Sequence, residues 1–143
     1  MNRIGLRKEE KAFETRVALI PDQVRKLREE YGIQFIVEPS NQRAFDEDEF
    51  VKAGAKITPL KGSGVPVILG IKEMPKDFFE RDIVYIFFSH TIKGQKYNMP
   101  MLKRILETGA TLIDYERVVD EKGKRLIFFG NWAGMAGISD TLR

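Results

Sequence analysis

Short strand-like runs alternate with segments of helical periodicity along the chain, and this alternation constrains the fold more than any other feature. The runs lie at residues 3–7, 34–38, 67–71, 84–88 and 111–114. An alternation of strands and helices is typical of an α/β protein whose sheet is mainly parallel. The third and fourth runs are continuously apolar, as expected of strands that are covered on both faces. We therefore predict one mainly parallel sheet flanked by helices.

Helices are predicted between these runs, and their ends carry recognisable signals. The helical segments span residues 21–31, 46–54 and 98–109. Gly32 stands where a left-handed C-cap is expected, because glycine adopts positive φ without steric cost. Asp46 and Glu49 have the spacing of a capping box, which predicts the start of the second helix, and Gly54 predicts its end.

The sequence of residues 117–143 predicts a turn followed by a helix. Residues 117–119 and 125–129 flank a hairpin-like turn at residues 120–123, where glycine is available for positive φ. Residues 130–143 are rich in glycine and alanine and predict the start of a helix with one close-packing face. No repeat or linker divides the chain, so we predict a single domain over residues 1–143.

Composition excludes several classes of function. Lysine and arginine outnumber aspartate and glutamate by only 24 to 21, and the charges are interspersed, so we expect no nucleic-acid partner. The chain has no cysteine and one histidine, which leaves no set of metal ligands. No apolar stretch approaches the roughly 18 residues of a membrane span. We expect no membrane partner and a cytoplasmic protein, or an organellar one after loss of a transit peptide.

Polar residues follow three of the predicted strands at the points where the strands end. Lys72 and Glu73 follow the third run, His90 the fourth and Glu116 the fifth. The carboxyl ends of parallel strands meet at one edge of a sheet, and ligands gather there. Histidine changes charge near neutrality, and a lysine in a dry cleft can accept a proton. Each of these side chains taken alone could equally be a solvated or capping residue.

Two arginines are candidates for carboxylate recognition. Arg16 lies between the first strand and the first helix, and Arg125 lies after the predicted turn. A guanidinium group presents two parallel donors that match the two oxygens of a carboxylate. The alternative for each arginine is an ion pair at the surface.

The chain carries no motif for a nucleotide or for a nucleophilic serine. Gly130, Gly134 and Gly137 follow the dinucleotide-binding pattern G-x-G-x-x-G only loosely, and no G-x-S-x-G segment occurs. We therefore expect no cofactor to bind tightly to this chain alone.

Several segments resemble one known family in order along nearly the whole chain. Residues 7–21 are similar to the opening of the alanine dehydrogenase and transhydrogenase N-terminal domain. Segments that resemble lysine-2-oxoglutarate reductase and saccharopine dehydrogenase are EPSNQRAF (38–45), ILGIKEMP (68–75), FFSHTIKGQ (87–95), LIDYE (112–116) and FGNWAGMAG (129–137). The resemblance implies a flavodoxin-like or Rossmann-like substrate-side domain without a G-x-G-x-x-G site, in which residues 130–143 start an interdomain helix.

The resemblance also implies an activity. It points to an NAD(P)-dependent oxidoreductase acting on CH–NH groups, which joins lysine and 2-oxoglutarate through an imine to give saccharopine, or runs the reverse reaction. The acid–base residues of the family fall on Lys72 and His90. Its substrate-binding residues fall on Arg16, Glu73, Glu116 and Arg125.

The implied partners are lysine, 2-oxoglutarate, saccharopine and a Rossmann domain or chain that holds NAD or NADP; homo-oligomerisation stays open. Family enzymes continue into such a domain, so we expect the chain to be inactive without one. Two alternatives remain. One is a catalytically silent regulatory module that binds dicarboxylates or amino acids, and the other is a different amino-acid dehydrogenase of the same superfamily.

Overall fold

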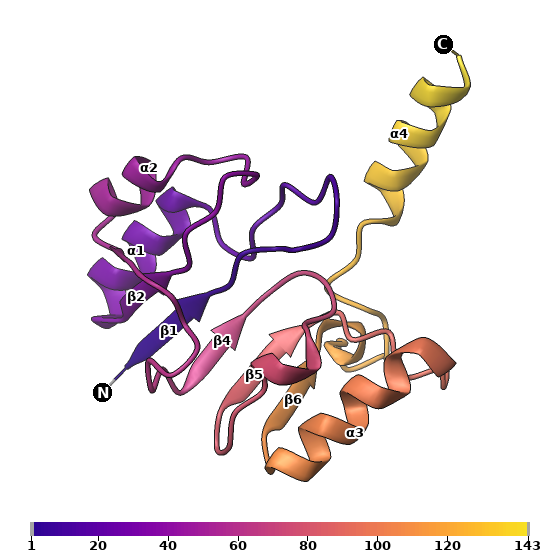
Figure 1. Ribbon diagram of the computed structural model, residues 1–143. Coiled ribbons are helices and arrows are strands. Elements are labelled where there is room, and N and C mark those ends of the chain that lie inside the picture. The colour runs from indigo at the N-terminus through magenta and orange to yellow at the C-terminus, as the bar shows by residue number, and fades with distance from the viewer. Residues whose placement is uncertain (1, 143) are drawn as a thin grey trace.

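The computed structural model describes residues 2–142, and these residues form a six-stranded sheet with helices on both faces (Figure 1). The strands are β1 (Arg3–Leu6), β2 (Gln34–Val37), β3 (Lys56–Ile57), β4 (Val67–Leu69), β5 (Val84–Phe87) and β6 (Thr111–Asp114). Their order across the sheet is β3-β2-β1-β4-β5-β6, and every neighbouring pair is parallel. The predicted α/β class is confirmed.

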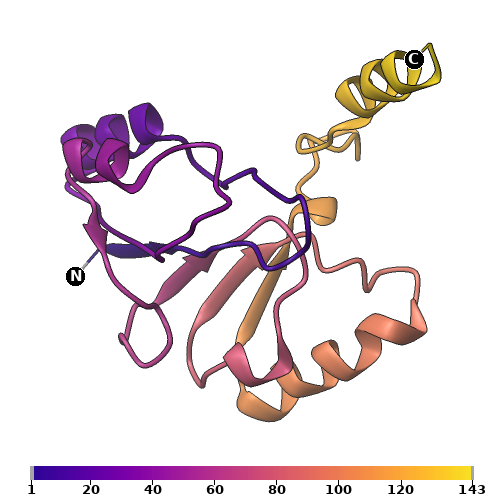
Figure 2. The same cartoon turned by 45° about the horizontal axis from the view of Figure 1, so that its top comes forward.

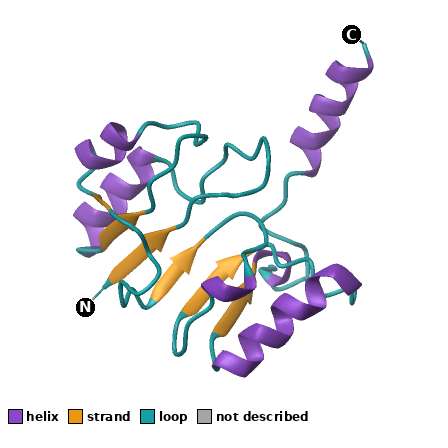
Figure 3. Ribbon diagram, viewed as in Figure 1, coloured by secondary structure: helices purple, strands orange, loops and turns teal. Residues whose placement is uncertain are grey.

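The helices are drawn in purple in Figure 3. They are α1 (Pro21–Tyr31), α2 (Glu47–Lys52), α3 (Met99–Thr108) and α4 (Gly130–Thr141), with 3₁₀ turns η1 (Lys76–Phe78), η2 (Lys96–Asn98) and η3 (Tyr115–Arg117). Gly32 closes α1 at φ 64°, and its N–H donates to Arg28 O at 3.0 Å. Glu49 Oε1 accepts from the Asp46 N–H at 2.9 Å, as the capping-box spacing predicted.

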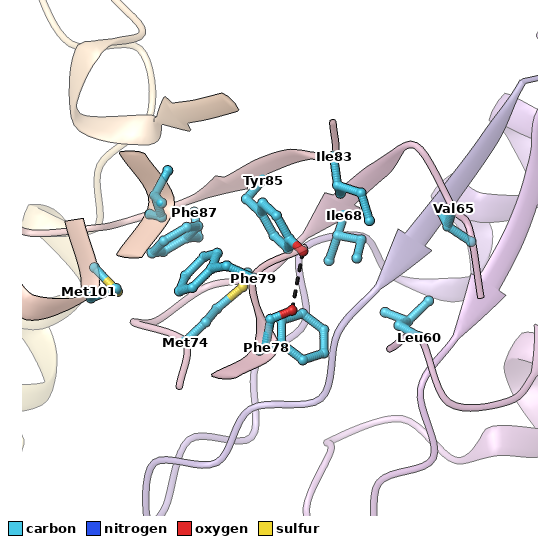
Figure 4. Close-up of a cluster of buried hydrophobic side chains, with 11 residues drawn as sticks. Leu60, Val65, Ile68, Met74, Phe78, Phe79, Ile83, Tyr85, Phe87 and Met101 are labelled. Carbon is cyan, nitrogen blue, oxygen red and sulfur yellow. Dashed lines mark hydrogen bonds between the residues drawn. The ribbon is translucent and has the colours of Figure 1, made fainter. Parts of the chain in front are cut away.

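The helices divide between the two faces of the sheet (Figure 2). α1 and α2 cover one face, over a cluster of buried residues that includes Val24, Phe35 and Phe50. η1 and α3 cover the other face, over a second cluster that is centred on Tyr85 (Figure 4). The Tyr85 ring packs edge-on against Phe79 with 4.9 Å between centroids, and its hydroxyl is hydrogen-bonded.

Three details differ from the prediction. The third strand in chain order, β3, was not predicted, because two residues are too few to show a period. α2 ends at Lys52 rather than reaching Gly54. The hairpin-like turn is present, with Gly123 at φ 76°, but the residues that flank it form only one antiparallel bridge, between Val119 and Arg125. Backbone N–H groups there are capped by the Asp120 side chain, so a longer ladder is not needed.

α4 projects away from the sheet and carries the C-terminal end of the described chain (Figure 1). All of its residues are exposed, including Trp132 at 71% and Ile138 at 64%. None of the helices within residues 2–142 combines the length and apolar character needed to cross a membrane.

The strand order reverses between β1 and β4, which are neighbours although other elements separate them in the chain. The loops after these two strands must therefore leave toward opposite faces, and a crevice opens between them. Ligands of open α/β sheets bind at such a point, outside the carboxyl ends of the strands. The loops after β1, β4, β5 and β6 all reach this edge.

Candidate functional site

A pocket of about 300 Å³ lies at the carboxyl edge of the sheet and gathers most of the polar residues singled out from the sequence. Its polar lining consists of Arg16, Lys72, His90, Glu116 and Arg125. These residues come from the loops after β1, β4, β5 and β6 and from the segment before α4. The rest of the lining is Phe88 and residues 127–130, so the pocket is lined by both charged and aromatic side chains.

Glu73 does not line the pocket, but its carboxylate contacts the His90 imidazole. Its Oε1 lies 2.8 Å from His90 Nδ1, and the two side chains are largely buried. Burial acts to raise the pKa of Glu73. Hydrogen bonds from its own backbone N–H and from His90, with the positive charges of His90 and Lys11, outweigh burial and lower that pKa. A charged Glu73 fixes the imidazole orientation and leaves Nε2 as the ring nitrogen free of this contact.

The backbone at His90 is held in the left-handed region, at φ 51°. Non-glycine residues adopt this conformation uncommonly, although histidine does so more often than most. The Asn98 amide supplies one restraint, because its Nδ2 donates to Ser89 O at 2.9 Å and to His90 O at 3.4 Å. Phe88 supplies another, because its ring stacks on the imidazole with 6.3 Å between centroids.

A buried polar link joins the loop after β5 to the loop after β6. Ser89 Oγ donates to Asp114 Oδ2, and both residues are buried. Asp114 Oδ1 accepts from the Glu116 N–H at 2.8 Å. The carboxylate of Asp114 therefore fixes the backbone at Glu116 relative to the residue before His90.

The two arginines of the pocket each meet a carboxylate of the chain. Glu14 binds Arg16 through Nε at 2.7 Å and through a terminal guanidinium nitrogen at 2.5 Å, and the guanidinium lies 4.7 Å from the Phe129 ring centre. This hydrogen bond lowers the pKa of Glu14 and raises that of Arg16. Arg125 lies 3.3 Å from Glu116 Oε1 and is about half exposed. Both arginines retain donors for a ligand.

Lys72 is oriented by its backbone. Glu9, which is 6% exposed, accepts from Ile71 N at 2.7 Å and from Lys72 N at 2.9 Å. Within residues 2–142 the Lys72 ammonium forms no salt bridge, although it lines the pocket. The site therefore offers one lysine whose charge no side chain of the described part neutralises directly.

The aromatic side of the site stays neutral. Phe88 packs on Tyr115 with 5.0 Å between centroids and on Phe129 with 5.7 Å. Burial, together with the charge of Glu9, raises the pKa of Tyr115 to about 12. The phenol is therefore not a base near neutral pH.

The residues present do not fit a dinucleotide or a metal ion. The turn after β1, where a dinucleotide fold places a glycine-rich loop, reads Arg7-Lys8-Glu9-Glu10 and contains a buried carboxylate that would oppose a pyrophosphate. No group of three or more histidine, cysteine or acidic residues in the described chain could hold a metal. The site suits small molecules with carboxylate and amine groups.

The structure thus brings together all six residues singled out from the sequence: five line the pocket and Glu73 contacts His90. Sequence reasoning missed the residues that contact or position the six, which are Glu9, Glu14, Ser89, Asn98 and Asp114. Two of them could have been noticed from the sequence, since Glu14 lies two positions before Arg16 and Ser89 directly precedes His90. The contacts of Glu9 join segments that are far apart in the sequence, and no local pattern indicates them. Those of Asn98 span eight and nine positions, which match no helical or strand period.

Comparisons with known proteins agree with this picture. The family model of the alanine dehydrogenase/PNT N-terminal domain matches residues 5–136. The chain is 42% identical over 140 residues to the bovine mitochondrial alpha-aminoadipic semialdehyde synthase, covering 97% of this chain and 15% of that protein. It is 41% identical over 142 residues to the saccharopine dehydrogenase [NAD(+), L-lysine-forming] of Emericella nidulans, covering 95% of this chain and 37% of that protein. The chain thus spans well under half of these relatives.

Solved structures show the same fold. An L-alanine dehydrogenase superposes with a TM-score of 0.73 at 26% identity, over 85% of this chain and 34% of that one. A transhydrogenase from Sinorhizobium meliloti superposes with a TM-score of 0.68 at 20% identity, which supports the fold alone. By its sequence and its fold, this chain belongs to the alanine dehydrogenase/PNT N-terminal domain family.

Proposed function

We propose that the chain is the substrate-binding and acid–base half of an NAD(P)-dependent oxidoreductase that joins lysine and 2-oxoglutarate to give saccharopine, or runs the reverse reaction. One observation carries the proposal: two arginines, a lysine, a histidine and a glutamate from five separate segments line one pocket. The names of the relatives add the substrate class, since one is a lysine-forming saccharopine dehydrogenase.

Carboxylate binding is assigned to Arg16 and Arg125. Saccharopine carries three carboxylates, and a guanidinium group binds a carboxylate through two parallel hydrogen bonds. Arg16 lies over the Phe129 ring and is held by Glu14, so little side-chain freedom is left to lose on binding. Glu116 is placed to receive the positively charged amine of the amino-acid substrate.

Proton transfer is assigned to His90 and Lys72. The side-chain amine of lysine adds to the ketone carbon of 2-oxoglutarate, and loss of water from the carbinolamine gives an imine. This loss requires one group that protonates the leaving oxygen and one that removes the proton from nitrogen. His90 is oriented by Glu73, and Lys72 faces the same pocket, so the two groups reach the reacting atoms from different strands.

The hydride that reduces the imine would come from NADH or NADPH. Since the residues of this chain do not fit a dinucleotide, we assign the cofactor to a separate nucleotide-binding unit. We further infer that α4 is the start of the helix that leads to this unit. Its exposed Trp132, Met135 and Ile138 are apolar surface that a second unit would cover.

A reconstitution assay tests the proposal. The chain is combined with its nucleotide-binding unit, and oxidation of NADH and NADPH is followed with lysine plus 2-oxoglutarate and, separately, with ammonia plus pyruvate. Turnover that requires lysine and 2-oxoglutarate, and that falls roughly 10² to 10⁴-fold in His90→Gln, supports it. Arg16→Ala should raise KM for 2-oxoglutarate, whereas Arg25→Ala, which removes an exposed arginine of α1, should not. Turnover with ammonia plus pyruvate, and none with lysine plus 2-oxoglutarate, would assign a different amino-acid dehydrogenase.

The second candidate is a binding module without catalysis. It is favoured by the position of Arg16, which Glu14 and Phe129 hold ready in the chain by itself. Calorimetry of the chain alone with 2-oxoglutarate separates the two: binding that Arg16→Ala abolishes, with no redox turnover in any reconstitution, would select the module.

A further inference from the structure

We propose that Glu9 is a positioning residue for Lys72. It fixes the backbone position from which the Lys72 side chain extends. The inference rests on the proposed role of Lys72 in proton transfer and extends it to a carboxylate that does not line the pocket. Glu9 touches Lys72 only through the backbone in the structure, so it is not a catalytic residue.

The need for Glu9 arises where β1 and β4 separate. The last backbone hydrogen bond between them joins Arg7 N to Leu69 O at 2.9 Å. Beyond it the two chains diverge, and Ile71 and Lys72 lie in a bend after the end of β4. The two carboxylate oxygens of Glu9 accept from their backbone N–H groups at 2.7 and 2.9 Å, one each. The side chain thus holds two consecutive backbone N–H groups in the bend after β4, at the strand-order reversal.

Burial makes this arrangement specific. Glu9 is 6% exposed, and within the described residues it forms no salt bridge. A buried carboxylate is costly unless hydrogen bonds stabilise its charge, so the two N–H groups are its main compensation. Space around it is also restricted, because a Cβ at Gly70 would lie 2.7 Å from Met74 Cε and 3.5 Å from Glu9 Oε1. Lys72 therefore starts from a backbone with little freedom to shift.

The other side of Glu9 is tied to the loop that carries Arg16. Gln42 Nε2 donates to Glu9 O at 2.6 Å and to Glu14 O at 3.2 Å. Glu14 in turn binds the Arg16 guanidinium. Glu9 consequently joins the carboxylate-binding loop after β1 to the Lys72 loop after β4, and it fixes the spacing between a bound carboxylate and the proton-transfer group.

The test compares Glu9→Gln with Glu80→Gln. Glutamine keeps the size of Glu9 but points an NH₂ group at one of two N–H donors. Glu80 is the matched control, since it accepts from the Gly62 N–H at 3.0 and 3.2 Å in a loop that does not line the pocket. Both variants lose a carboxylate that caps backbone N–H groups, so a general loss of stability is common to both.

The first readout needs no catalysis. The rate at which trinitrobenzene sulfonate labels Lys72 in this chain is measured by mass spectrometry across pH, with the exposed Lys76 as internal reference. Glu9→Gln should change the ratio of the Lys72 rate to the Lys76 rate roughly fivefold, and Glu80→Gln should leave it unchanged. The second readout is turnover of the complete enzyme, where Glu9→Gln should lower kcat roughly 10 to 100-fold with little change in KM.

The outcomes separate this inference from the proposed function. An unchanged Lys72 labelling ratio in a folded Glu9→Gln variant overturns the positioning role, whatever the enzyme assay gives. A changed ratio with no turnover of the wild-type complete enzyme keeps the positioning role and refutes the proposed function. If Glu9→Gln does not fold, Glu9→Asp keeps the charge but falls short by one methylene, and an unchanged ratio in that variant overturns the inference equally.

Discussion

Glu14 makes the stability of the loop after β1 depend on pH. It is 8% exposed, and its hydrogen bond to Arg16 lowers its pKa below the ordinary 4.5. A carboxyl whose pKa is lowered by folding stabilises the fold fully above its unfolded pKa, and this contribution is lost as pH falls through the folded pKa. The pKa of Glu9 shifts in the opposite direction, because burial raises it and disfavours the charged form of Glu9 in the folded state.

A substitution at Glu14 should therefore show a pH-dependent cost. Glu14→Gln is expected to lower the free energy of unfolding by ~1–2 kcal/mol at pH 7, because a charged hydrogen bond is weakened. The difference from wild type should shrink at an acidic pH below the lowered pKa of Glu14, where the wild-type carboxyl is protonated as well. Urea unfolding at both pH values measures it, with Glu29→Gln on the exposed face of α1 as control. An equal cost at both pH values would contradict the assignment.

For single residues, the sequence predicted the side chains that line the pocket better than the residues that position them. Lys72, His90 and Glu116 could be named because each directly follows an apolar strand, and parallel strands end at one edge. Their supports could not, because they depend on how loops diverge in space. Glu9 and Lys72 are 63 positions apart, and Asn98 contacts His90 O from the end of η2.

The helix ends can be tested by adding one methyl group. Gly32 and Gly109 end α1 and α3 at φ 64° and 72°, and a Cβ at either would meet no atom within 4 Å. Replacing either with alanine should cost about 1 kcal/mol of unfolding free energy, from backbone strain alone. Gly134→Ala in α4 is the matched control, because that glycine is helical and equally uncrowded. A cost as large there would show that the strain argument is wrong.

The core between the sheet and α3 depends on one buried hydroxyl. Tyr85 is fully buried; its hydroxyl donates to Phe78 O at 3.2 Å and accepts from the Glu80 N–H at 2.9 Å. Tyr85→Phe should lower the free energy of unfolding by ~1–2 kcal/mol, because both backbone groups lose a partner. Chemical denaturation measures the loss. Tyr97→Phe, at an exposed site in η2, should cause no measurable change.

Elements were predictable where periodicity or end signals were strong. α1 matches its predicted range because Pro21 and Gly32 mark both ends. β3 and the segment after η3 could not be predicted well, since one is two residues long and the other is held by turn contacts. Tertiary pairing, not local preference, decides such segments.

The whole molecule consists of a packed sheet and a helix that adds nothing to its packing. Removing residues 130–143 should leave the thermal unfolding midpoint within ~2 °C of wild type, because every α4 residue is exposed. Val24→Ala, which opens space beneath α1, should lower the midpoint by several degrees. Differential scanning calorimetry compares the three proteins. A large loss on truncation would mean that α4 packs against the sheet in solution.

The exposure of α4 has a practical consequence for spectroscopy. Trp132 is the chain's single tryptophan and lies on this helix. Its fluorescence therefore reports on α4 alone, with emission at the long wavelengths of a water-surrounded indole. A shift of that emission to shorter wavelength during a titration would record, without any label, the moment when another surface closes over the helix.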